Sequence, residues 1–222
     1  MSKIKVNEIS KHDASEITIN DTIKVDTISE KTSTAGVTID SVLLKDGNVD
    51  GVDVSALNTT VSAIKQGITE FDQWRWTSNV SATETLADSW ARPTGTLQGG
   101  YIGTGMAVDS STGAWTFPST GLWKVEGTFY LHIQTTSATY LTVKSIATDD
   151  NFSSEDEIDY AVHFGNGNVD RATVSNIMLL DIQNTSNDKI KFKFEESTGT
   201  GQMEGSTSEN RTYITFTRMG DT

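Results

Sequence analysis

The sequence predicts a mainly β protein with three parts: a β-rich N-terminal shaft that assembles as a trimer, a short coiled-coil neck, and a C-terminal antiparallel jelly-roll β-sandwich. Three observations predict this. Every Trp, Tyr and Phe of the 222 residues lies at or after Phe71. Apolar residues follow a three-and-four spacing from Val54 to Phe71. Beyond Trp74, short segments alternate apolar and polar residues, as strands with one buried face do.

Residues 1–52 are expected to form an arm and the β-rich shaft. Aromatic side chains give the largest burial per residue, and this segment has none, so it is poorly equipped to build its own core. Its apolar residues are mostly Ile and Val, which favour strands, and ITIN at 17–20 resembles VTID at 37–40. Because such short strands cannot bury a face within one thin chain, we expect copies of the segment to stack around an axis. A disordered arm that orders only on its partner is the alternative.

Residues 53–73 are expected to form the neck. Their apolar residues fall on the a and d positions of a heptad seam, with β-branched residues at every a position: Val54, Leu57, Val61, Ile64, Ile68 and Phe71. About two and a half heptads are marginal for an isolated helix, and Gly67 weakens a helix by roughly 1 kcal/mol relative to Ala. An ordinary amphipathic helix packed on a domain is the alternative to a trimeric neck.

Residues 74–222 are expected to form the sandwich, because many short alternating segments are separated by Gly, Asn, Ser and Asp clusters. The segment 121–133 places Trp123 and Val125 on one face and Lys124 and Glu126 on the other. The segment 157–164 places Ile158, Tyr160, Val162 and Phe164 on one face and Asp159, Ala161 and His163 on the other. Further candidate strands are 139–147, 172–182, 189–195 and 211–219.

Composition restricts the function. The formal net charge is −13, from 30 acidic and 17 basic residues, which argues against a surface that neutralises phosphates, so we expect no nucleic-acid partner. The absence of cysteine excludes disulfide frameworks, thiolate metal sites and cysteine nucleophiles. No apolar run approaches the roughly 18 residues that span a bilayer, and the start lacks the apolar core of a signal peptide, so we expect no membrane insertion.

No catalytic constellation stands out, and we do not expect an enzyme. The sequence has three histidines and lacks the GxSxG, HExxH and P-loop motifs. The adjacent acidic pairs Asp149–Asp150 and Glu195–Glu196 diverge on a strand, unlike the paired carboxylates of a glycosidase. Carboxylates that converge from distant loops are the alternative.

Two groups of residues are candidates for binding. The acidic run 149–159 is rich in the oxygen ligands that Ca²⁺ prefers, and its candidate ligands are Asp149, Asp150 and Asp156. It lacks the glycine and spacing of an EF-hand, and a solvated acidic loop is the alternative. No other cofactor is expected. The loop aromatics Tyr101 and Trp90 are candidate receptor contacts, with a core role as the alternative for each.

The segment TGAWTFPSTGLWKV at 112–125 resembles a signature of the globular head of complement first component, q type, a trimeric jelly roll of the tumour-necrosis-factor superfamily. The matching positions are Thr112, Gly113, Trp115, Thr116, Pro118, Gly121, Leu122 and Trp123. YITFTRM at 213–219 is similar to the last strand of that family. The sequence departs from the pattern at Val125, where the family has Phe. The resemblance implies a TNF-like head in a homotrimer.

The N-terminal fifty residues and the general plan resemble small fibre or appendage proteins of tailed bacteriophages. Phrases such as SEKTSTAGVTIDSVLLKDG at 29–47 look like the repetitive shaft sequences of that group. The resemblance implies a structural protein of the virion, made in the host cytoplasm. It further implies that the arm at 1–52 attaches to another virion protein and that the head binds a glycan or protein of the host surface.

These observations lead to a trimeric tail-fibre protein with an adhesive head. One alternative is a capsid-mounted head fibre or decoration protein. Another is a secreted trimeric binding module encoded by a cell.

Overall fold

The computed structural model describes residues 37–39, 42–45, 48–49, 52–63, 67–95, 97, 99–136, 140–165, 169–197 and 200–222. The chain divides into two units, Met1–Lys65 and Gln66–Thr222. The predicted strand at 17–20 lies outside the described residues. Within the described ranges, no helix has both the length and the apolar character needed to cross a bilayer.

The first unit contains four short strands, each antiparallel to the next, in the order β1-β2-β3-β4. Their bounds are β1 Val37–Ile39, β2 Val42–Lys45, β3 Asn48–Val49 and β4 Val52–Asp53. β1 confirms the strand predicted at 37–40. The connections hold only two residues each, so the chain folds back on itself as a meander.

Helix α1 spans Val54–Ala63 and follows β4 directly. It begins where the heptad pattern predicts, and the side chains of Val54, Leu57 and Val61 are 45%, 50% and 57% exposed. Apolar side chains on one seam of a helix are therefore left uncovered in the single chain.

The helix is shorter than the predicted neck. Ile64 lies outside the described residues, Ile68 lies beyond the helix, and Phe71 is the first residue of a strand. Gly67 has a φ of 89°, a left-handed conformation that a right-handed helix does not contain. The expectation that the helix continues to Phe71 is therefore wrong, and the described part of this single chain contains no coiled coil.

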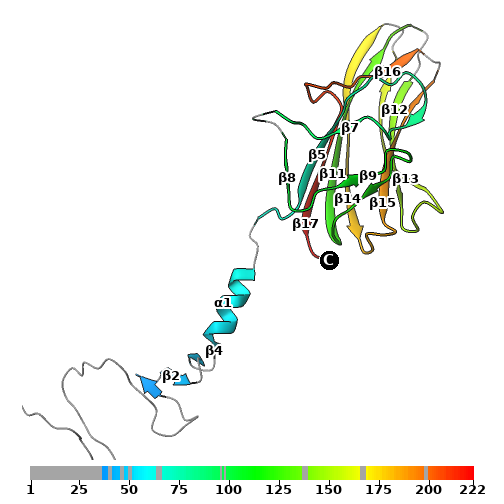
Figure 1. Ribbon diagram of the computed structural model, residues 1–222. Helices are drawn as coiled ribbons and strands as arrows, with labels where there is room; N and C mark the ends of the chain where they lie inside the picture. Colours follow the sequence, from blue (N-terminus) through cyan, green and yellow to red (C-terminus); the bar gives the residue numbers. More distant parts are fainter. Residues whose placement is uncertain are drawn as a thin grey trace, which may run out of the picture. The chain divides into compact units, whose positions relative to one another are not determined.

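The second unit consists of two antiparallel sheets (Figure 1). The seven-stranded sheet has the order β14-β11-β17-β5-β7, with β16 paired to β11 and β8 to β5. Its strands are β5 Phe71–Trp76, β7 Trp90–Ala91, β8 Tyr101–Ile102, β11 Gly121–Ile133, β14 Asp170–Ile182, β16 Gly201–Met203 and β17 Tyr213–Gly220.

The six-stranded sheet has the order β13-β12-β15-β10-β9, with β6 paired to β15. Its strands are β6 Glu84–Thr85, β9 Ala107–Val108, β10 Trp115–Thr116, β12 Tyr140–Thr148, β13 Asp156–Phe164 and β15 Lys189–Glu196. Each of the six strands predicted in the head is present within two residues of its predicted ends.

The connections between the long strands are those of a jelly roll. β12 and β13 form a hairpin within one sheet, whereas the chain passes to the other sheet between β11 and β12, β13 and β14, β14 and β15, and β15 and β17. The predicted jelly-roll sandwich is therefore confirmed for the head.

The core lies between the two sheets and is largely aromatic. Trp115 packs against Trp74, Trp90 and Phe216 at ring-centroid distances of 4.9 to 5.6 Å. β11 alternates buried and half-buried residues along its whole length, as the sequence predicts. The largest fully buried side chains include Trp76, Trp115, Trp123, Phe117, Phe129, Phe192, Phe194 and Phe216.

The signature at 112–125 is a turn and a strand connection that place two tryptophans in this core. The Asp109 carboxylate accepts hydrogen bonds from the backbone N–H groups of Ser111 and Thr112, at 2.8 and 3.2 Å, just before β10. Gly121 opens β11 with a φ of 123°, and a Cβ there would lie 2.4 Å from the carbonyl oxygen of Gly220. Only glycine avoids both the backbone strain and the clash.

Candidate functional site

The outer face of the seven-stranded sheet carries large apolar side chains on its edge strand β14. Ile177 and Leu179 are 62% and 61% exposed, although their neighbours Met178 and Leu180 already pack on the core. An antiparallel sheet with one solvated face normally places polar residues outward. We call Ile177 and Leu179 the exposed apolar face of β14, and their exposure makes this face a candidate contact surface.

The edge strand of the other sheet, β13, also turns its large side chains outward. Ala161 points into the sandwich and is 5% exposed, whereas Tyr160 and Phe164 are 60% and 68% exposed. The alternation predicted for this strand is correct, but its larger apolar face is the outer one. β13 and β14 lie side by side along one edge of the sandwich.

A groove of about 300 Å³ lies on the outer face of the six-stranded sheet. We call it the β12–β13 groove, and it is lined by Tyr140, Thr142, Lys144, Glu157, Tyr160, Val162, Phe164 and Glu195. Three of its rings are exposed, since Tyr140 is 41% exposed and Tyr160 and Phe164 are more so.

The polar side of this groove is held by ion pairs. The ammonium group of Lys144 lies 2.9 Å from a carboxylate oxygen of Glu157 and 3.0 Å from one of Glu195. Lys193 lies 2.8 Å from the other oxygen of Glu195. Glu157, followed by Glu195, raises the pKa of the Lys144 ammonium. Lys193, with Lys144, holds the pKa of the Glu195 carboxyl below its usual value, against the effect of burial.

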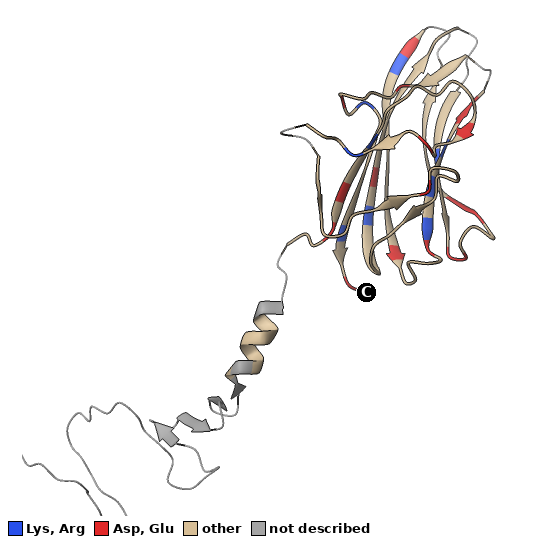
Figure 2. Cartoon of the chain, in the orientation of Figure 1, with Lys and Arg blue, Asp and Glu red and all other residues tan. Residues whose placement is uncertain are grey.

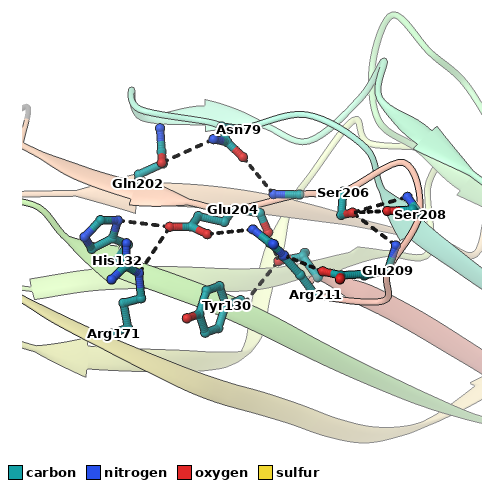
Figure 3. A network of polar contacts seen from close by, with 12 residues as sticks. Asn79, Tyr130, His132, Arg171, Gln202, Glu204, Ser206, Ser208, Glu209 and Arg211 are labelled. Carbon is teal, nitrogen blue, oxygen red and sulfur yellow. Dashed lines mark hydrogen bonds and ion pairs between the residues drawn. The ribbon is translucent and has the colours of Figure 1, made fainter.

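A second polar cluster surrounds Glu204 (Figure 3). Its carboxylate lies 3.0 Å from Nδ1 of His132, 3.5 Å from Nε of Arg171 and 3.1 Å from Nη1 of Arg211. Arg211 also pairs with Glu209 at 3.0 Å. The backbone carbonyl of Glu204 accepts a hydrogen bond from the Thr212 hydroxyl at 2.8 Å. The cluster joins β11, β14 and the segment that leads into β17, and its buried carboxylate is fully engaged by protein groups.

The two sequence-predicted receptor residues lie in different environments. Tyr101 is 51% exposed, and the guanidinium of Arg92 lies 4.5 Å from its ring centre. Trp90 is 8% exposed, its indole N–H donates to the Leu86 carbonyl, and its ring packs on Trp76. Trp90 therefore has the core role that the sequence left as the alternative, and its ring is not available to a ligand.

The candidate calcium ligands are not assembled into a site. Asp150 accepts hydrogen bonds from the Thr148 hydroxyl at 2.7 Å and from the Ser154 backbone N–H at 2.9 Å. These bonds, that from Ser154 foremost, lower the pKa of Asp150 to about 2. Among the described residues, which include Asp149 and Asp156, no three His, Cys, Asp or Glu side chains are placed to hold a metal ion. The carboxylate of Asp150 caps the turn after β12 instead.

Charge is mixed over the head. Figure 2 shows acidic and basic residues interspersed along its strands and loops. Exposed aromatic and apolar side chains gather in the β12–β13 groove and on the exposed apolar face of β14, and further ones lie at Leu97, Tyr101, Ile102, Val169 and Met219.

Comparison with known proteins gives a likeness of fold only. No family model matches the sequence, and no curated protein is similar to it. Among solved structures, murine APRIL at pH 5.0 has 10% identity over 68% of this chain and 98% of its own, with a TM-score of 0.49. Eiger TNF from S. frugiperda has 12% identity over 69% of this chain and 95% of its own, with a TM-score of 0.46. At these values the likenesses carry no argument about ligand or assembly, and the jelly-roll assignment stands on the strand order.

The sequence did not single out the groove as a site. Tyr160 and Phe164 were visible as alternating apolar residues, but alternation does not reveal which face of a strand is buried. One signal could have told the two faces of β13 apart. Ala161 is small and alternates with the large residues Tyr160 and Phe164, and a small side chain fits a tightly packed inner face.

Proposed function

We propose that the chain is a homotrimeric structural appendage of a phage virion, a tail fibre whose head binds a component of the host surface without catalysis. The observation that carries the trimer is the exposed apolar face of β14. The virion assignment is supported by the resemblance of the N-terminal fifty residues to phage shaft sequences. In this proposal the arm at 1–52 attaches to another virion protein.

The exposed apolar face supplies a driving force for association. Full burial of a Leu or Ile side chain stabilises a protein by about 1.5–3 kcal/mol. Ile177 and Leu179 are each about three-fifths exposed, so covering both contributes about 2–4 kcal/mol per subunit contact. A closed ring of three contacts gives each head two neighbours, and the uncovered Val54, Leu57 and Val61 of α1 offer a second seam.

Trimerisation would make weak head contacts useful. Three heads on one assembly turn the second and third binding events into intramolecular ones, which raises the overall avidity without any new contact. An adhesive appendage needs this behaviour, since single contacts can be weak and reversible.

Light scattering of the full chain tests the trimer. We expect a species of three times the 24.1 kDa chain mass. The pair Ile177→Asp and Leu179→Asp is expected to give a smaller species with an unchanged far-UV spectrum. The matched control is Ala82→Asp with Ser110→Asp, which adds the same charge at exposed loop positions near β6 and β9, across the sheet from β13.

The outcomes separate the two seams. A folded wild-type chain of 24.1 kDa would overturn the trimer. A trimer that survives the β14 pair but is lost with Val61→Asp and Ile64→Asp would assign assembly to the neck and overturn the role of β14. Immuno-electron microscopy of intact particles tests the virion assignment, and absence of the protein from purified particles would refute it.

A further inference from the structure

We propose that the β12–β13 groove is a saccharide-binding site that takes a neutral, hexose-containing glycan. This inference rests on the proposed binding role of the head and names the ligand class and the residues that meet it.

The hollow follows from the order of side-chain sizes along two paired strands. In the register of β12 and β13, Tyr140 lies opposite Phe164, Thr142 opposite Val162, and Lys144 opposite Tyr160. The middle pair is small and both outer pairs are large. Side chains on one face of a strand recur every two residues, or about 6.7 Å, so the two ends of the hollow are about 13 Å apart. A space of about 300 Å³ is at the lower end of ligand pockets and suits a small saccharide.

The apolar walls of the groove fit the C–H faces of a sugar ring. Aromatic faces carry partial negative charge, and the axial hydrogens on one side of a pyranose are apolar and weakly positive. The exposed rings of Tyr160 and Phe164 stand at the two ends, and Val162 forms an apolar floor between them.

The polar wall fits the hydroxyl groups of the same ring. Glu157 and Glu195 are held by Lys144, and Glu195 also by Lys193. Lys144 and the two carboxylates line the groove and Lys193 does not, so the wall offers hydrogen-bond donors and acceptors with an excess of negative charge. This excess disfavours an anion. A cation would have to compete with Lys144 for the same two carboxylates, so the wall favours a neutral polyhydroxyl ligand.

The same charges argue against a second copy of the chain as occupant. The centres of protein–protein interfaces are depleted of charged residues, whereas Lys144, Glu157 and Glu195 line this hollow. The groove also lies on the opposite sheet from Ile177 and Leu179.

The β12 side of the site is anchored to the core. Leu141 and Val143 alternate with the groove residues of β12 and are completely buried in the core, and β12 is paired on both sides, with β13 and with β15. Because paired strands and ion pairs hold Lys144, Glu157 and Glu195, these side chains of the polar wall lose little conformational entropy on binding.

The test is binding of simple sugars to the full chain. The methyl glycosides of glucose, galactose and mannose are titrated by saturation-transfer NMR, with N-acetylneuraminic acid as an anionic comparator. We expect at least one neutral glycoside to bind with a Kd in the range of about 1–10 mM and more tightly than the acid. Tyr160→Ala and Phe164→Ala should each weaken this binding about tenfold or more, whereas Tyr160→Phe should retain it. Met219→Ala, which removes an apolar side chain that is 59% exposed on β17 of the other sheet, is the matched control and should leave it unchanged.

Three results would overturn the proposal. The first is that no neutral glycoside binds up to about 50 mM, well above the weakest expected Kd, and the second is that binding survives both alanine variants. The third is a smaller assembly on light scattering for Tyr160→Ala, which would make the groove a subunit contact. A monomeric wild-type chain that binds a glycoside through these residues would refute the trimer and leave the groove intact. A trimer that binds no sugar would refute the saccharide site and leave the trimer intact.

Discussion

Replacement of Asp72 by alanine is expected to destabilise the head by about 3 kcal/mol. The Asp72 side chain is buried and accepts hydrogen bonds from three donors: Nε and Nη2 of Arg92, at 3.0 and 2.7 Å, and the backbone N–H of Met106, at 2.8 Å. Removing one partner of a buried ion pair costs about 3–5 kcal/mol. Since the Arg92 side chain is 30% exposed, water replaces part of the lost interaction and the lower figure applies.

Thermal unfolding of the full chain at fixed concentration checks this value. For a domain of this size, 1 kcal/mol shifts Tm by about 2–4 °C, so the Tm of the Asp72→Ala variant should fall by about 6–12 °C. The control is Asp221→Ala, which removes a carboxylate that is 91% exposed and pairs with Arg218; its cost should stay below about 1 kcal/mol. If the two variants unfold within a few degrees of each other, the carboxylate of Asp72 does not anchor the segment that carries Arg92 and Met106.

Three further outcomes are expected. Gly121→Ala should destabilise by at least about 1–3 kcal/mol, from the positive φ alone, and a denaturant midpoint equal to that of the wild type would contradict the clash with Gly220. Phe192→Ala should lower the free energy of unfolding by about 3–5 kcal/mol, because the Phe192 ring is completely buried between the rings of Trp90 and Phe129. A smaller loss in a urea titration would show that neighbouring side chains move in to fill the cavity. Asp150 has a folded pKa of about 2, below its usual value of 3.8, so its contribution is complete above about pH 4 and is lost as the pH falls toward 2. The Tm of Asp150→Asn should accordingly fall less than that of the wild type over this range.

Strands such as β11, β13 and β15 could be predicted because each carries its own alternation. In β11 apolar and polar residues alternate from Trp123 to Glu126, and burial alternates along the whole strand. The signature at 112–125 was equally local, since its glycines and tryptophans act within one turn and the strand that follows it.

Other features depend on contacts that no short segment contains. The outward orientation of Tyr160 on β13 depends on how its sheet packs against the other one. The pairing of Asp72 with Arg92 joins residues twenty positions apart, and the burial of Trp90 depends on the rings of Trp76 and Trp115. The end of α1 was misplaced because the apolar spacing continues to Phe71, while Gly67 adopts a conformation that the spacing does not reveal.

The pairing of β17 with β5 decides how the head can be labelled. Thr217 lies opposite Phe71 and Gly220 opposite Leu122, so β5 begins and β17 ends at the same end of the head (Figure 1). The opposite end holds the connection after β11, where the N–H of Gln134 donates to the carbonyl of Thr200. A gold cluster bound to a peptide tag fused after Thr222 would therefore mark the end of each head where β5 begins. A peptide inserted after Gln134 would be displayed at the opposite end.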